Sequence, residues 1–259
     1  MAGTVAYQID GCVVPATGFE LTATDVEEIA PAIRAILRDD SGLSEAFEAL
    51  QDLPRTEFAV TTLQRVLEPP SEFAEWRVGE ALAEHHLSNS RDCTFPWADS
   101  RSARNPNSIS GGVDLIGFHS GDRVRFVFVE VKTSHHQSWP PSVVTSRSEG
   151  LRGQLSGLND SDDRSRWAIK YLTMNSINKP WFSIHRQAMQ TYLADAKDVM
   201  LFGVLVHVTT ANMKDLEALT NRLSELPATK TAIELIGLYI EADVLASLVE
   251  GSIAVETAA

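Results

Sequence analysis

Two hydrophobic patterns alternate along the chain. Runs of β-branched and aromatic residues bounded by turn-forming residues are typical of buried strands. They occupy residues 4–10, 12–16, 111–118, 123–133, 199–210 and 231–240. Apolar residues at helical spacing predict helices at residues 22–40, 41–53, 71–87, 146–158, 164–177 and 212–226. This alternation predicts an α/β fold with a mixed central sheet flanked by helices.

A proline-containing break at residues 68–73 divides the pattern into two parts. We expect residues 1–70 to form an N-terminal accessory region that is mostly helical after one or two short strands. Residues 71–259 are expected to form the main α/β domain. Ser71 is the expected N-cap of that domain's first helix, and Pro31 is expected to limit the first turn of the helix at 22–40.

The composition, with 44% hydrophobic and 22% charged residues in 259, is that of a globular chain. The longest apolar stretch, 199–208, is far shorter than the roughly 20 residues that a membrane-spanning helix needs. The N-terminus lacks the basic start and apolar centre of a secretion signal. The two cysteines share no metal-ligand spacing and are expected to be free thiols. A cytoplasmic protein without membrane association is therefore expected.

The net charge of −13 argues against a nucleic-acid partner, because phosphates are bound by Lys and Arg. The charge is unevenly distributed, however. Residues 101–170 carry 10 basic and 7 acidic side chains, whereas residues 1–60 carry 3 basic and 11 acidic ones. The basic segment is either a surface for a phosphate-bearing ligand or an ordinary solvated face.

That segment contains a strand-like run, FVFVEVKTS at 126–134, with two charges in its middle. Because side chains alternate along a strand, Glu130 and Lys132 share one face. A turn centred on Gly121 and Asp122 would set Asp114 opposite Phe128 or Glu130. Adjacent buried carboxylates repel one another unless a proton or a cation resolves the conflict. Mg²⁺ or Mn²⁺ would do so, and Lys132 could then orient the attacking water or neutralise a phosphate.

These residues, GGVDLIG followed by EVK, resemble the Asp…(Asp/Glu)-x-Lys signature of the PD-(D/E)xK, or restriction-endonuclease-like, nuclease superfamily. The resemblance covers about 71–210 and implies an αβββαβ core, with the Asp on the second core strand and the Glu-x-Lys on the third. It implies hydrolysis of phosphodiester bonds in DNA with Mg²⁺ or Mn²⁺. Many members add a Glu from the preceding helix, a role that Glu80 matches, so Glu80, Asp114 and Glu130 are the implied metal ligands and Lys132 completes the catalytic set. Val113 replaces the usual Pro.

The RVGE of the helix at 71–87, together with GGVDLIGF and EVK, also resembles the nuclease subunit of Hachiman-type antiphage defence systems. Those nucleases act with a helicase partner. The resemblance implies a role in antiviral defence, with a helicase subunit supplying part of the grip on DNA.

Several polar residues are candidates for contact with the substrate. Arg101, Arg104, Arg147 and Arg152 can contact phosphates or form ordinary ion pairs. Gln154 lies where some relatives carry a Gln-x-x-x-Tyr motif, but the matching Tyr is absent. We predict substrate contacts for Arg101, Arg104, Arg152 and Gln154.

Three other interpretations stay open. Lys132 can form a purely structural ion pair with Asp114 or Glu130. The chain can be a non-catalytic module of nuclease fold that binds nucleic acid or scaffolds a partner. A small-molecule enzyme on an unrelated α/β fold is the third, although the sequence has no Gly-rich phosphate loop or nucleophile motif to support it.

Overall fold

The computed structural model of the chain describes residues 3–70, 72–98, 101, 112–160 and 162–253. A mixed sheet of seven strands, in the order β1-β2-β7-β6-β5-β4-β3, forms its centre. The strands are β1 (Thr4–Ile9), β2 (Ala16–Leu21), β3 (Cys93–Thr94), β4 (Leu115–Ser120), β5 (Val124–Ser134), β6 (Met200–His207) and β7 (Ala232–Ile240). The helices are α1 (Ala23–Arg38), α2 (Asp40–Leu50), α3 (Glu57–Val66), α4 (Glu75–Ser90), α5 (Ser142–Thr145), α6 (Leu151–Asp160), α7 (Asp162–Ser176), α8 (Phe182–Ala194), α9 (Lys214–Ser224) and α10 (Ala242–Ile253).

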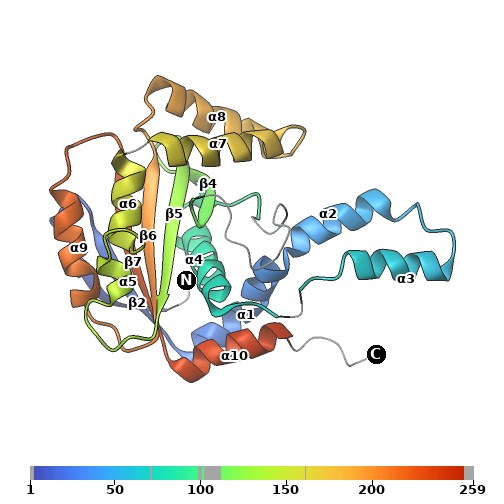
Figure 1. The fold of residues 1–259 in the computed structure, drawn as a ribbon, viewed down its shortest axis with the longest axis horizontal. Helices are drawn as coiled ribbons and strands as arrows, with labels where there is room; N and C mark the ends of the chain where they lie inside the picture. Colours follow the sequence, from blue (N-terminus) through green and yellow to red (C-terminus); the bar gives the residue numbers. More distant parts are fainter. Residues whose placement is uncertain (1–2, 71, 99–100, 102–111, 161, 254–259) are drawn as a thin grey trace.

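Helices cover both faces of the sheet (Figure 1). Helices α1, α4 and α10 pack on one face, and α5, α6 and α9 pack on the other. Helices α7 and α8 lie together across one end of the second layer. The predicted α/β class and the mixed sheet flanked by helices are therefore confirmed.

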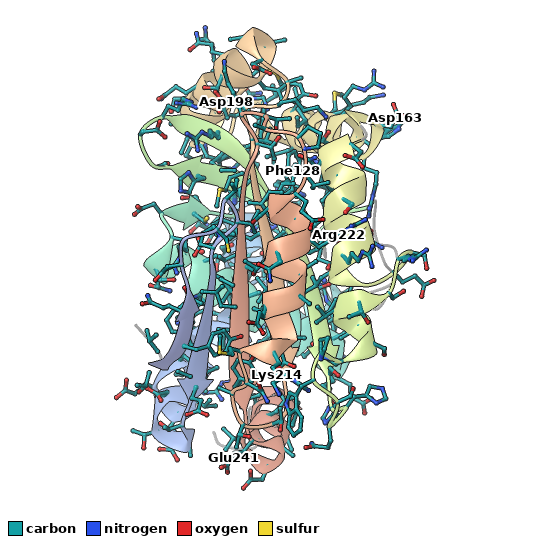
Figure 2. The ribbon with its side chains drawn as sticks, turned by 90° about the vertical axis from the view of Figure 1, so that its left-hand side faces the viewer. Phe128, Asp163, Asp198, Lys214, Arg222 and Glu241 are labelled. Atoms are coloured by element: carbon teal, nitrogen blue, oxygen red, sulfur yellow. The ribbon has the colours of Figure 1, made fainter. Side chains whose placement is uncertain are left out.

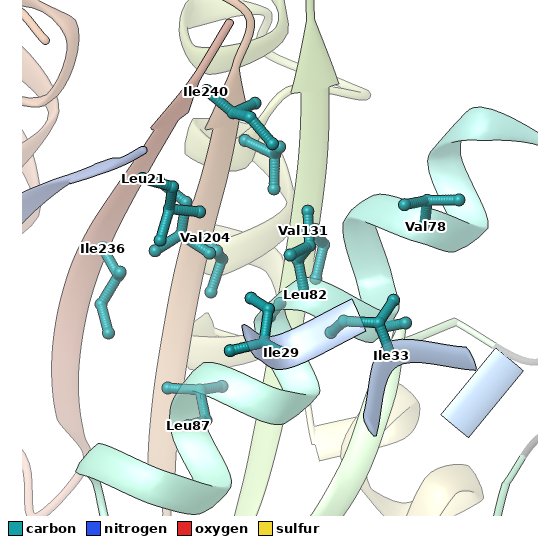
Figure 3. Close-up of a cluster of buried hydrophobic side chains, with 14 of the residues drawn as sticks. Leu21, Ile29, Ile33, Val78, Leu82, Leu87, Val131, Val204, Ile236 and Ile240 are labelled. Atoms are coloured by element: carbon teal, nitrogen blue, oxygen red, sulfur yellow. The ribbon is translucent and has the colours of Figure 1, made fainter. Parts of the chain in front are cut away.

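Strand β5 separates the two hydrophobic cores because its side chains alternate between them. Val127, Val129 and Val131 belong to the core beneath α1, α4 and α10, part of which is shown in Figure 3. Phe126 and Phe128 belong to the core beneath α6 to α9. Burial of each such side chain contributes about 1.5–3 kcal/mol, so both cores fix the position of β5.

The sheet runs across the expected boundary at residue 70. Strand β2 pairs in parallel with β7, with Ala16 opposite Leu235 and Leu21 opposite Ile240. Strand β1 pairs antiparallel with β2 and forms the sheet edge. The first 70 residues therefore contribute two strands and α1 to the same sheet and core that carry the later elements, and only α2 and α3 stand apart.

Helices α2 and α3 form an arm that projects from the body (Figure 1). None of the residues in these two helices, all of which the structure describes, is buried. Both helices are amphipathic, and Phe47, Phe58 and Val66 are exposed. Short helices of this kind gain little from packing against the rest of the chain.

Two expectations about helix ends were wrong. Pro31 lies inside α1, which continues to Arg38, because the burial of Ile29 and Ile33 outweighs one missing intrahelical hydrogen bond. Helix α4 begins at Glu75 with Ala74 as its N-cap and no side-chain cap. Ser71 lies outside the described residues and is too many positions upstream to cap the helix.

Candidate active site

The β4–β5 hairpin brings Asp114 and Glu130 together. Leu115 pairs with Val129, so the preceding residue, Asp114, comes opposite Glu130, which is one of the two partners that the turn geometry predicted. Asp114 lies immediately before β4, and its backbone N–H donates to the carbonyl of Val129 at 3.1 Å. The hairpin register alone therefore juxtaposes two carboxylates.

The side chain of Asp114 is fixed by the neighbouring strand. The backbone N–H of Val131 donates to Asp114 Oδ2 at 2.7 Å. Lys132 Nζ lies 3.7 Å from the same oxygen and 3.8 Å from Glu130 Oε2. Lys132 thus lies between both carboxylates, and these three residues, Asp114, Glu130 and Lys132, are called the catalytic cluster below.

Glu130 is the buried member of the catalytic cluster, with 2% of its surface exposed. Burial and, to a smaller extent, the negative charge of Asp114 raise the pKa of Glu130 to about 7, although Lys132 and Arg164 oppose the rise. A carboxyl with such a pKa is partly protonated near neutral pH. The site therefore retains a charge conflict that Lys132 does not fully remove.

Arg164, a residue that the sequence interpretation missed, closes one side of the site. Its Nη2 lies 3.4 Å from Glu130 Oε1 and donates to the carbonyl of Gly112. It comes from α7, 34 residues beyond Glu130. The sequence signal was a basic residue near the start of a predicted helix, and such residues are too common on solvated helices to mark a site.

The catalytic cluster lies in a cleft of about 870 Å³, the size of many ligand sites. Its walls include Trp76, Arg77 and Glu80 from α4, and Ser146 and Gln154 from the segment that forms α5 and α6. Glycine at position 79 lets α4 lie close to β5, because a Cβ there would collide with the hydroxyl of Thr133. This close approach places Glu80 in the cleft wall.

Glu80 does not join Asp114 and Glu130 in a three-carboxylate group. Its Oε2 lies 3.2 Å from Arg77 Nη1 on the same helix. Within the described residues, no three Asp, Glu, His or Cys side chains are grouped closely enough to hold a metal ion. Glu80, Asp114 and Glu130, the three metal ligands implied by the resemblance, therefore do not form one group in this structure.

The donor set still suits Mg²⁺ or Mn²⁺. These ions are commonly bound by one or two carboxylates, with water and substrate phosphate completing the shell. Asp114 and Glu130 supply two carboxylates in a wide cleft, and burial together with the charge of Asp114 raises the pKa of Glu130 despite the nearby Lys132 and Arg164. A divalent cation would favour the ionised form of both carboxylates.

The residues predicted to bind substrate are scattered. Arg101 is occupied by Asp39, with Nε–Oδ2 and Nη2–Oδ1 distances of 2.6 and 2.7 Å, so it fastens the start of α2 to the body. Arg104 lies outside the described residues. Gln154 lines the cleft, but its Nε2 donates to the carbonyl of Ser148 at 3.2 Å. Arg152 lines a different pocket, on the other side of α6.

Comparison with known proteins adds no assignment: no protein-family model and no curated protein matches the chain. None of the described helices combines the length and apolar character that a bilayer crossing requires.

Proposed function

We propose that the protein is a metal-dependent nuclease that hydrolyses phosphodiester bonds in DNA, with a restriction-endonuclease-like core. The observation that carries the proposal is the convergence of Asp114, buried Glu130 and Lys132 in one cleft. Two carboxylates and an ammonium around one point can together hold a divalent cation and orient a water for phosphodiester hydrolysis.

The order and pairing of the elements around the site support this proposal. Helix α4 is followed by the antiparallel strands β3, β4 and β5, and β6 then pairs in parallel with β5 after intervening helices. This is the αβββαβ order of the nuclease superfamily that the sequence resembles. The resemblance implies an Asp on the second of these strands, and Asp114 lies immediately before that strand; the Glu-x-Lys lies on the third, where the resemblance implies it.

Each residue of the site has a part in the proposed reaction. Asp114 and Glu130 would hold the ion, and Glu80, which is paired with Arg77, lies in the same cleft wall. When bound, a divalent cation supplies Lewis-acid stabilisation of the negative charge that develops on the phosphate. Lys132 Nζ donates hydrogen bonds, so it can orient the attacking water or neutralise a phosphate oxygen in the transition state. Arg164 keeps Glu130 in place and favours its ionised form.

The cellular part of the proposal is antiphage defence in the cytoplasm together with a helicase partner. It is supported only by the resemblance to Hachiman-type nuclease subunits. It agrees with a net charge of −13, because a chain this acidic gains little from long-range attraction to DNA and benefits from a partner that grips the strand.

A non-catalytic module is the second candidate function, and one observation favours it. Lys132 lies between the two carboxylates at 3.7 and 3.8 Å and partly neutralises them without any metal. In such a module the catalytic cluster would be a structural ion pair that stabilises the hairpin.

Cleavage of DNA separates the two candidates. Purified wild type, Glu130→Gln and Lys132→Met are incubated with Mn²⁺ or Mg²⁺ and with single- and double-stranded DNA. Glu48→Gln on α2 and Arg65→Met on α3 are matched controls, because they remove one negative and one positive charge on the distant arm. The nuclease proposal expects cleavage by wild type and both controls and loss in both site variants. No product from any of the five proteins under any condition would favour the non-catalytic module, and equal product from all five would show that Glu130 and Lys132 do not catalyse the cleavage.

A further inference from the structure

A second pocket, of about 360 Å³, lies outside the cleft that holds the catalytic cluster. It is bounded by α5, by the start of α6 and by α9, which lies beside them on the face shown in Figure 2. The chain from 146 to 154 separates the two cavities: Ser146 and Gln154 line the cleft, whereas Arg147 and Arg152 line the second pocket. We call this cavity the arginine pocket.

Three arginines surround the arginine pocket in a strongly acidic protein. Arg222 from α9 joins Arg147 and Arg152, and Figure 2 shows it beside α6. Neither Arg147 nor Arg152 has a hydrogen-bond or ion-pair partner among the described residues. Arg222 lies 3.2 Å from Glu225, but the two side chains are 60% and 68% exposed, so this pair is weak and easily exchanged. Guanidinium groups that are unpaired or only weakly paired can bind a phosphate bidentately.

The inner part of the pocket is apolar, with one buried acceptor. Val144 and Leu219 are buried and form part of its wall. Asp215 is fully buried and also lines the pocket. Its Oδ2 accepts from Tyr239 at 3.1 Å and lies 2.9 Å from His207 Nδ1. Its Oδ1 is buried without any partner in the described structure.

The charge of Asp215 is compensated from behind, so it does not repel an anion at the rim. His207 Nε2 lies 2.6 Å from the carbonyl of His136, which can only accept, so this nitrogen carries a hydrogen. The other ring nitrogen faces Asp215 Oδ2, and one hydrogen lies between them. Whichever atom holds that hydrogen, the His207–Asp215 pair carries no net charge, and the three arginines set the charge of the pocket.

The pocket is also held in shape. A Cβ at Gly153 would collide with the carbonyl of Arg147, so the loop before α6 packs directly on the first turn of that helix. Gln154 Nε2 fastens the same loop through Ser148. Arg147 and Arg152 are consequently presented on one compact element.

We propose that the arginine pocket binds a nucleotide by its phosphate, either as a free mononucleotide or as the 5′-phosphorylated end of a strand. The phosphate would lie at Arg147, Arg152 and Arg222, and the sugar and base would lie over the apolar wall. This combination of a rim of cations and an apolar wall is not used by the catalytic cluster, and the proposal does not depend on the nuclease activity.

The test measures binding in EDTA, so that no metal contributes. Deoxyadenosine 5′-monophosphate, inorganic phosphate and a 5′-phosphorylated ten-nucleotide oligothymidylate are titrated into the full chain and into Arg152→Ala, Arg222→Ala and the control Arg65→Ala. Thermal unfolding of each variant reports whether it is folded. The Arg222 side chain is exposed, so Arg222→Ala is not expected to disturb the fold.

We expect the mononucleotide or the phosphorylated oligonucleotide to bind about tenfold or more weakly to Arg152→Ala and Arg222→Ala than to wild type and Arg65→Ala. A loss confined to the mononucleotide identifies a free nucleotide as the ligand, and a loss confined to the oligonucleotide identifies a strand end. No binding by wild type, or equal binding by folded Arg222→Ala and wild type, would overturn the proposal. Inorganic phosphate that binds as tightly as either nucleotide ligand would overturn the part assigned to the base.

Discussion

Glu130 and Arg164 meet on one side of the cleft, with 3.4 Å between Oε1 and Nη2. The glutamate is buried on a central strand, whereas the arginine extends from α7, and its second contact is the carbonyl of Gly112, two residues before Asp114. Arg164 thus touches both sides of the hairpin that carries the carboxylates. The ionisation of Glu130 therefore depends on the position of α7, which carries Arg164.

Replacing Arg164 should therefore change the pH dependence of metal binding. Without the guanidinium, the pKa of Glu130 rises further above about 7, because one of its two nearby cations is lost. A metal ligand must be deprotonated, so Arg164→Met should bind Mn²⁺ more weakly than wild type at pH 7 and recover at pH 9. Calorimetric titration across this range measures the shift. Arg166→Met, two residues along the same helix and exposed, is the control, and an identical pH midpoint in all three proteins would contradict the assignment.

Glu130 should also make the protein less stable as pH rises, even without metal. Its folded-state pKa of about 7 lies above the ordinary value of 4.5, so its contribution is fully present below pH 4.5 and is lost as pH rises through 7. Glu130→Gln removes this dependence and should be more stable than wild type at pH 8, by on the order of 3 kcal/mol. Urea unfolding at pH 5 and pH 8 tests this. A similar pH slope for wild type, Glu130→Gln and the exposed control Glu48→Gln would show that burial of Glu130 carries no such penalty.

Asp114 has a structural role, as a hydrogen-bond acceptor, that can be tested separately from its charge. Its Oδ2 accepts from the N–H of Val131, so Asp114→Ala leaves that backbone group without its partner. Asp114→Asn retains an acceptor of the same shape. At pH 5, where Glu130 is mostly neutral, we expect the Ala variant to be less stable than the Asn variant by about 1–2 kcal/mol in urea unfolding. Equal stability would mean that this hydrogen bond does not order the hairpin.

The sequence predicted the local features of the site well because they follow from strand periodicity and one short turn. Glu130 and Lys132 share a face because they are two positions apart on β5. The hairpin register then placed Asp114 opposite Glu130. No tertiary information was needed for either inference.

The contacts that the sequence did not predict join distant segments. Arg101 was expected to bind phosphate, but it pairs with Asp39, 62 positions away, and nothing in the local pattern marks that partner. Strand β2 was expected in a separate accessory region. Its parallel partner, β7, lies near the other end of the chain, and nothing in the sequence around β2 indicates that pairing. Helices α8 and α10 were also missed. The residue order near Arg164 gave no indication that α7 turns one side chain toward β5.

Titration of Mn²⁺ into wild type, Asp114→Asn and Glu130→Gln at pH 8 tests most directly whether the catalytic cluster is a metal site. At this pH Glu130 is mostly ionised in the wild type, and binding of the ion should release a fraction of a proton, which titration in two buffers of different ionisation enthalpy detects. We predict that wild type and the control Glu48→Gln bind Mn²⁺ and that both site variants lose at least tenfold in affinity. Unchanged Mn²⁺ affinity in Asp114→Asn and Glu130→Gln, or no binding by wild type, would contradict the account.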